Sequence, residues 1–238
     1  MLLIDLISPT LQLNRVHMVE FVAWEKTPRY FRDIVITEKI DGVTTAVVIE
    51  QHYFGTHVDG IPSDVITLVC GPNDETGTPE FEYTVSAQSR KRLITPESDN
   101  HGFAKWVSDN ASSLVRDLGA GRHFGEWWGS GINRGYGLTN GVKVFSLFNT
   151  RKWFGVDEQF ETPNLTVVPV LFQGDHDMHE VDDALDSLRD YGSAATVDFD
   201  GSEYRNPEGV CIFHTAANRV FKVTLEDDAV PKVLAAAA

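Results

Sequence analysis

A lysine stands between two carboxylates in residues 38–42, Glu-Lys-Ile-Asp-Gly. Apolar runs over residues 34–36 and 46–49 flank this segment, and their β-branched residues predict strands. Lys39 is therefore expected at a strand end or in a turn. A lysine held there among apolar residues loses hydration, which favours a neutral amine able to attack an electrophile. Lys39 is a candidate covalent nucleophile, and the alternative is an exposed turn, because Asp-Gly is a common hairpin pair.

Four further segments carry residues that could assist such a nucleophile. Arg90 follows a predicted strand, where a guanidinium can grip phosphate or carboxylate, although a solvated turn is the simpler reading. Glu126 lies beside a glycine and two tryptophans, and since an unpaired buried carboxylate is costly, it suits a ligand hydroxyl or an indirect metal contact. Glu208 stands at the start of an apolar strand and could contribute to a site. The alternative is a plain turn that leads into the strand. Lys222 lies on a mixed strand face that could line a site or meet solvent.

The composition indicates a globular protein without membrane or disulfide signatures. The 238 residues are 42% hydrophobic, and no segment resembles a transmembrane span or secretory signal. Cys70 and Cys211 lie far apart in apolar contexts, which predicts reduced core thiols and a cytoplasmic location. The net charge of −15 argues against nucleic-acid binding by overall attraction, but local basic patches such as Arg151-Lys152 leave it open.

The elements that must position these residues are mostly strands. Strands are predicted over residues 33–37, 44–51, 65–70, 83–87, 123–128, 143–148, 167–171, 209–214 and 219–225. Helices are predicted over residues 101–118 and 179–191, where apolar residues recur at helical spacing. No linker divides the chain, so we expect one α+β domain built on antiparallel sheets over residues 1–238.

The order of these motifs resembles the covalent nucleotidyltransferase superfamily of polynucleotide ligases and capping enzymes. Within it the chain is most similar to ATP-dependent RNA ligases of the phage double-strand-sealing type. The resemblance runs from about Glu20 to Lys222 and implies an antiparallel-sheet, ATP-grasp-like ligase adenylation domain with inserted helices. The motifs that carry it are Lys39-x-Asp41-Gly42, Arg90, Gly125-Glu126, Glu208-Gly209-Val210 and Lys222.

The resemblance also implies a mechanism and a role for each residue. Lys39 would attack the α-phosphate of ATP, hold AMP as a phosphoramidate and pass the AMP to a 5′-phosphate end. A 3′-hydroxyl would then displace the AMP and form the phosphodiester. Lys222 would bind the α-phosphate, and Glu208 would position Mg²⁺ or Mn²⁺. The remaining nucleotide contacts would come from Glu38 and Ile40 beside the nucleophile, Arg90 with Arg92 as a neighbour, Glu126 on a ribose hydroxyl, and Phe148, or alternatively Phe145, stacked on adenine.

The chain departs from that pattern at two places. Thr224 stands where relatives often have a second lysine, and no separate C-terminal domain is expected. The partners implied are RNA ends or a nicked duplex, possibly DNA, with the protein acting as a monomer. The alternatives are a small DNA ligase, a capping enzyme, or a nucleotide- or end-binding module that has lost ligation. Residues 176–180 have metal-ligand types, but they precede an amphipathic helix whose first turn suits acids.

Overall fold

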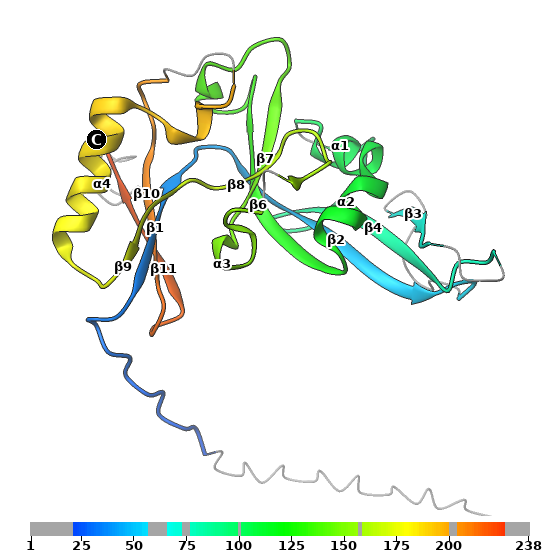
Figure 1. Ribbon diagram of the computed structural model, residues 1–238, viewed down its shortest axis with the longest axis horizontal. Helices are drawn as coiled ribbons and strands as arrows, with labels where there is room; N and C mark the ends of the chain where they lie inside the picture. The colour runs from blue at the N-terminus through cyan, green and yellow to red at the C-terminus, as the bar shows by residue number, and fades with distance from the viewer. Residues whose placement is uncertain are drawn as a thin grey trace, which may run out of the picture.

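The computed structural model describes residues 21–56, 66–72, 77–99, 101–156, 159–199 and 204–226. The residues after 226, where no further domain was expected, lie outside these ranges. Two β-sheets face one another across the molecule, as Figure 1 shows. Helices pack against both sheets, which confirms the α+β class predicted from the sequence. In the part of the chain that the structure describes, no helix is long and apolar enough to cross a membrane.

The first sheet has four antiparallel strands in the order β11-β10-β1-β9. They are β1 (Ile34–Lys39), β9 (Val170–Gly174), β10 (Gly209–His214) and β11 (Arg219–Thr224). Helix α4 (Met178–Tyr191) covers one face, where Leu185 and Leu188 pack against Ile34 and Ile36. The opposite face of β1, with Thr37 and Lys39, is left open to the cleft between the sheets.

The second sheet follows the order β3-β4-β2-β6-β7-β8, with β5 beside β4. Its pairs are antiparallel except for β7 and β8. Helices α1 (Phe103–Asp109) and α2 (Ala111–Leu118) cover one face and bury Phe103, Leu114 and Phe145 in the main core. The strands are β2 (Val43–Tyr53), β3 (Ile66–Cys70), β4 (Phe81–Ser89), β5 (Leu93–Ile94), β6 (Gly121–Gly129), β7 (Lys143–Leu147) and β8 (Leu165–Val167).

The chain passes from one sheet to the other immediately after Lys39. The three residues 40–42 join β1 to β2, so the hairpin alternative for Asp-Gly is wrong. Gly42 is required here by close packing, because a Cβ would lie 2.5 Å from the carbonyl oxygen of Trp127 and 2.8 Å from Cβ of Trp128. The crossing therefore fixes Lys39 at the edge where both sheets meet.

Three sequence-based predictions need correction. The helix predicted over 101–118 is two helices that meet at Asn110, and the strand predicted over 167–171 is two strands in different sheets, separated at Val168-Pro169. Cys70 is exposed rather than buried, because β3 is an edge strand of its sheet, while Cys211 is half-buried in the cleft. The short helix α3 (Thr150–Trp153) was not predicted, since four residues carry too little periodicity.

Candidate active site

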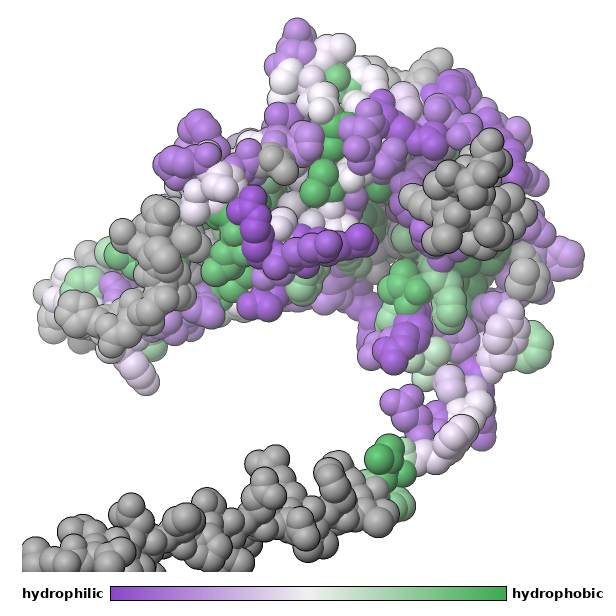
Figure 2. Space-filling view, turned by 180° about the vertical axis from the view of Figure 1, so that it is seen from behind, coloured by the Kyte–Doolittle hydropathy of each residue, from purple (hydrophilic) through white to green (hydrophobic). Residues whose placement is uncertain are grey.

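An open cleft with a volume of about 1350 Å³ lies between the two sheets. Strands β1, β10 and β11 line one side, and β2, β6 and the segment from the end of β7 through α3 line the other. Figure 2 shows hydrophilic side chains, with hydrophobic patches among them, around the hollow between the two halves of the molecule. Six cations line the cleft together with the carboxylates of three acidic residues: Lys39, Arg90, Arg122, Arg151, Lys152 and Lys222, with Asp41, Glu126 and Glu208.

Lys39 and Glu208 form the centre of the site. Lys39 is the last residue of β1 and pairs in register with Gly209, so Glu208 stands beside it at the start of β10. The Lys39 ammonium forms an ion pair with Oε2 of Glu208, with 21% and 17% of the two side chains exposed. Gly209 has φ of +150°, and a Cβ there would lie 2.2 Å from the carbonyl oxygen of Val223. Glycine is thus required at position 209 for β11 to approach this strand closely.

Lys222 enters the same cleft from β11. It pairs with Cys211, which in turn pairs with Thr37 of β1, so the three residues form a row across the sheet. Lys222 is exposed and lines the cleft. Thr224, two residues further along β11, pairs with Gly209 and donates its hydroxyl to the carbonyl of Glu226 at 2.8 Å. Of the two cations on β11, Arg219 and Lys222, it is Lys222 that lines the cleft.

Glu126 is a buried carboxylate aimed at the start of β2. It accepts hydrogen bonds from the backbone N–H of Gly42 and the hydroxyl of Thr44, both at 3.2 Å. Burial raises the pKa of Glu126 to about 7, although these hydrogen bonds and the charge of Lys39 act in the opposite direction. The neighbouring tryptophans predicted that an unpaired carboxylate would be costly to bury here. The hydrogen bonds from Gly42 and Thr44, in the segment that follows Lys39, offset that cost.

Glu38 and Ile40 lie next to Lys39 but point away from it. The Glu38 carboxylate accepts hydrogen bonds from the Ser193 hydroxyl at 2.7 Å and the Ala195 N–H at 3.0 Å, at the short helix η3 (Ala194–Thr196). Burial raises its pKa to about 7. Ile40 packs in a small core with Trp128 and other apolar residues. The side chains of both residues therefore anchor the strand that ends at Lys39. They point to the other side because side chains alternate along a strand.

The two candidate aromatics occupy different environments. Phe145 is fully buried in the main core, whereas Phe148 is 43% exposed and lines the cleft. Arg90 is exposed at the cleft just after β4. Arg92 instead reaches the hydroxyl and carbonyl oxygens of Ser98 at 3.3 and 3.4 Å. The structure therefore brings Phe148 and Arg90 to the site, and it places Phe145 and Arg92 elsewhere.

A loop after β6 holds the turn that follows Lys39, and sequence reasoning missed it. The Tyr136 hydroxyl accepts from the Asp41 N–H at 2.8 Å, and the Asn133 amide donates to the Asp41 carboxylate at 3.0 Å and the Gly42 carbonyl at 2.7 Å. Asn133 and Tyr136 both have positive φ, at 42° and 50°. Sequence reasoning missed these residues because non-glycine residues with positive φ leave no pattern in the sequence.

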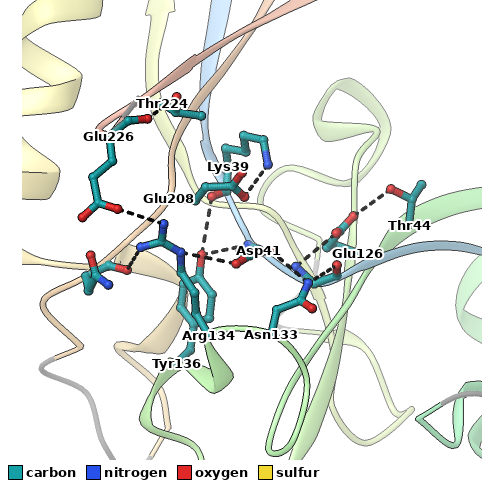
Figure 3. Close-up of polar contacts among 12 residues, drawn as sticks. Lys39, Asp41, Thr44, Glu126, Asn133, Arg134, Tyr136, Glu208, Thr224 and Glu226 are labelled. Carbon is teal, nitrogen blue, oxygen red and sulfur yellow. Dashed lines mark hydrogen bonds and ion pairs between the residues drawn. The ribbon is translucent and has the colours of Figure 1, made fainter. Parts of the chain in front are cut away.

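Arg134 in this loop joins three segments of the site, as Figure 3 shows. Its guanidinium lies 3.3 Å from the Asp41 carboxylate, 3.1 Å from the carbonyl of Asn206 and 3.5 Å from the Glu226 carboxylate. Asp41 follows Lys39, Asn206 precedes Glu208, and Glu226 follows β11. One side chain therefore fixes the relative positions of the strands that carry Lys39, Glu208 and Lys222.

The donor set suits a cation that is completed by substrate oxygens. Among the described residues, no group of three or more His, Cys, Asp or Glu is placed to hold a metal ion. Mg²⁺ commonly uses one or two carboxylates together with substrate phosphates and water. Glu208 and Glu126 could provide such carboxylates, because the two lie close enough for the charge of Glu208 to raise the pKa of Glu126. In residues 176–180, Asp177 instead caps helix α4 through the His179 N–H at 3.1 Å.

The comparisons with known proteins bear on this site. A family model described as RNA ligase matches residues 32–224, which include the cleft residues from Val35 to Lys222. No curated protein and no solved structure matches the chain. The matched span begins just before β1 and ends with β11, so it covers both sheets and every element that lines the cleft.

Proposed function

Because the chain belongs to the RNA ligase family, we propose that it seals RNA ends with ATP through a lysyl-AMP intermediate on Lys39. The observation that carries this proposal is the position of Lys39. It stands at a strand end in a large cleft, against Glu208 and opposite Glu126. Lys222 lies on β11 in the same sheet, in the row of paired residues that includes Thr37. These are a nucleophile, two carboxylates and a phosphate-binding cation in one place.

In the first step, the Lys39 amine attacks the α-phosphorus of ATP. An N–P bond forms, the bond from phosphorus to the bridging oxygen breaks, and pyrophosphate leaves. Lys39 must first lose a proton and separate from Glu208, whose carboxylate then becomes available to a divalent cation. Lys222 stabilises the charge on the phosphate oxygens. A bound Mg²⁺ or Mn²⁺ would add charge stabilisation for the same oxygens.

The nucleotide is held by the second sheet. Glu126 accepts a hydrogen bond from a ribose hydroxyl, and Phe148 stacks on adenine; the exposure of the Phe148 ring in the cleft supports that role. Arg90 supplies a further cation at the cleft edge. In the later steps, AMP passes to the 5′-phosphate of an RNA end, and a 3′-hydroxyl displaces it to form the phosphodiester. The leading substrate is a nicked RNA duplex, and the protein acts as a monomer.

Thr224 favours a second candidate function. Without the second lysine of the strand, the chain could bind nucleotide or RNA ends and not complete ligation. The bonding of Thr224 to the Glu226 carbonyl shows that its hydroxyl is engaged in ending β11. The two functions differ in whether label on the protein is passed to RNA.

Labelled ATP tests both. The protein is incubated with α-³²P-ATP and Mg²⁺, separated on a denaturing gel, and then given nicked RNA or nicked DNA duplexes. We expect label on the protein, none on Lys39→Ala, and transfer of AMP followed by sealing of the RNA nick. Equal labelling of Lys39→Ala would contradict the mechanism. Label that never reaches an RNA end would favour the binding protein, and sealing of DNA alone would favour a DNA ligase.

A further inference from the structure

The far end of the cleft, at the start of β6 and at α3, holds cations without acidic partners. Arg122 and Arg151 line the cleft, and within the described ranges neither forms an ion pair. Carboxylates are abundant on a chain with a net charge of −15, so neighbours to neutralise these arginines could easily have been provided. Unneutralised guanidinium groups at a cleft wall indicate an anionic ligand supplied from outside.

The same end presents an aromatic ring to the cleft. Along β6 the side chains of Arg122, Phe124 and Glu126 alternate with His123 and Gly125, so the first three share the cleft face. Phe124 is 46% exposed, although phenylalanine is normally buried. Exposed aromatic rings beside cations are typical of surfaces on which nucleobases stack while arginines bind the backbone.

Helix α3 lies next to the cleft-facing side chains of β6. The Phe148 N–H donates to the Phe124 carbonyl at 3.0 Å, which joins the segment before α3 to β6. Lys152 reaches the Leu118 carbonyl at 3.4 Å, just before the β6 strand begins. Arg151 and Lys152 on α3 therefore flank the same row as Arg122 and Phe124, and all four residues line one cleft. We call these four residues the β6–α3 ledge.

The Arg122 end of the ledge lies beyond the reach of the proposed ribose site. Arg122 is four residues from Glu126, which is about 13 Å along an extended strand. If Glu126 binds the ribose of AMP, Arg122 is too far to serve the same sugar. The cleft volume of about 1350 Å³ also exceeds the 300–1,000 Å³ of ordinary small-ligand pockets. The remaining space suits a longer anion that continues from the nucleotide.

We propose that the β6–α3 ledge binds the RNA strand whose end is being sealed, with Phe124 stacking on a base and Arg122 and Arg151 holding backbone phosphates. The proposal rests on the proposed function, because it takes AMP to occupy the Glu126 end of the cleft. It adds a binding surface for the polynucleotide next to that site. The competing use of the same cations is to bind the β- and γ-phosphates of ATP.

The test separates RNA binding from the reaction with ATP. Arg122→Ala, Arg151→Ala and Phe124→Leu are compared with the control Arg116→Ala, an exposed arginine of α2 that pairs with Glu161 on the other side of the sheet. Binding of a fluorescent nicked RNA duplex is measured by anisotropy without ATP at several salt concentrations. Lysyl-AMP formation is measured on the same proteins without RNA, and circular dichroism verifies that they fold.

We expect each ledge variant to bind RNA about tenfold more weakly, and Phe124→Trp to bind more tightly than Phe124→Leu because it keeps a stacking ring. Each arginine variant should also lower the slope of log affinity against log salt by about one. Lysyl-AMP formation should fall much less than RNA binding. The control should match the wild type in both measurements.

Two results would overturn the proposal. If RNA affinity is the same in the ledge variants and in Arg116→Ala, the ledge does not bind the strand. If lysyl-AMP formation falls as much as RNA binding, the arginines serve ATP. Failure of the wild type to form lysyl-AMP is a different result, since it would contradict the proposed function while the RNA-binding comparison still tests the ledge.

Discussion

The two ends of the cleft differ in how their polar side chains are partnered. At the β1 end, Lys39 contacts Glu208, and Glu126 accepts from Gly42 and Thr44. At the β6–α3 end, Arg122 and Arg151 have no ion-pair partner among the described residues, and Phe124 is exposed. Groups that perform chemistry need fixed positions before substrate arrives, whereas groups that receive a large ligand obtain their partners from it.

Glu208→Ala should show the largest effect at the β1 end. The variant removes the ion-pair partner of Lys39 and the carboxylate proposed for the divalent cation. Lysyl-AMP formation should fall about 100-fold or more, a loss typical when a charge-stabilising group is removed from a reaction centre. Single-turnover labelling with α-³²P-ATP at several Mg²⁺ concentrations measures it. Glu161→Ala, which removes an exposed carboxylate paired with Arg116, serves as the control, and equal rates in the two variants would exclude a role for Glu208 in this step.

Arg134→Met should have the next largest effect. The arginine joins Asp41, Asn206 and Glu226 without lining the cleft itself, so its loss should loosen the spacing of Lys39 and Glu208. Small misplacements of reacting groups are costly, and we expect lysyl-AMP formation to slow about 10- to 100-fold with a smaller change in the KM for ATP.

Arg134→Lys provides the comparison for that variant. It keeps the charge near Asp41 but cannot span three acceptors as a guanidinium does, so its rate should lie between those of the wild type and Arg134→Met. Thermal unfolding is followed in parallel. If the rate of each variant follows its melting temperature and recovers fully when the assay is run well below that temperature, Arg134 is only a general stabilising residue.

Replacing each of the two phenylalanines by alanine distinguishes a cleft residue from a core residue. Phe148→Ala should weaken ATP binding about tenfold, since a stacked aromatic contributes about 1–3 kcal/mol per base. Phe145→Ala should instead cost about 3–5 kcal/mol of unfolding free energy, because its ring is fully buried in the main core. Nucleotide titration and urea unfolding of both variants measure the two effects. The opposite assignment of effects would show that Phe145 is the stacking residue.

Glu38→Gln should have the smallest effect on activity and a distinct effect on stability. Burial raises the pKa of Glu38 from 4.5 to about 7, so between these values the folded chain keeps a proton that the unfolded chain has lost. The stabilisation is complete below pH 4.5 and is lost as pH rises to about 7, by an amount on the order of 3 kcal/mol.

The variant should lose less unfolding free energy than the wild type between pH 5 and pH 8. Urea unfolding at both pH values measures the difference. Glu126 has a pKa raised in the same direction, but it is present in both proteins and cancels from the comparison. An identical pH dependence in the two proteins would mean that Glu38 is not the titrating group.

Much of the fold could be predicted from local patterns. Strand β10 has the predicted bounds, and β1 and β11 differ from the predicted strands by one or two residues, because alternation and β-branched residues are local signals. The split at Asn110 and the division between β8 and β9 were missed, because both depend on which sheet each segment packs against. Periodicity within a segment carries no such information.

The amino-acid sequence by itself determined the order of chemical groups: a lysine at a strand end, an arginine, a glutamate beside glycine, a second Glu-Gly and a strand lysine. The tertiary structure alone decided which of their neighbours face the cleft. It directed Glu38 toward Ser193, buried Phe145, exposed Phe148 and brought Arg134 to Asp41 across more than ninety residues of chain. Residue types fix what a side chain can do, but its direction and partners depend on how the two sheets pack together.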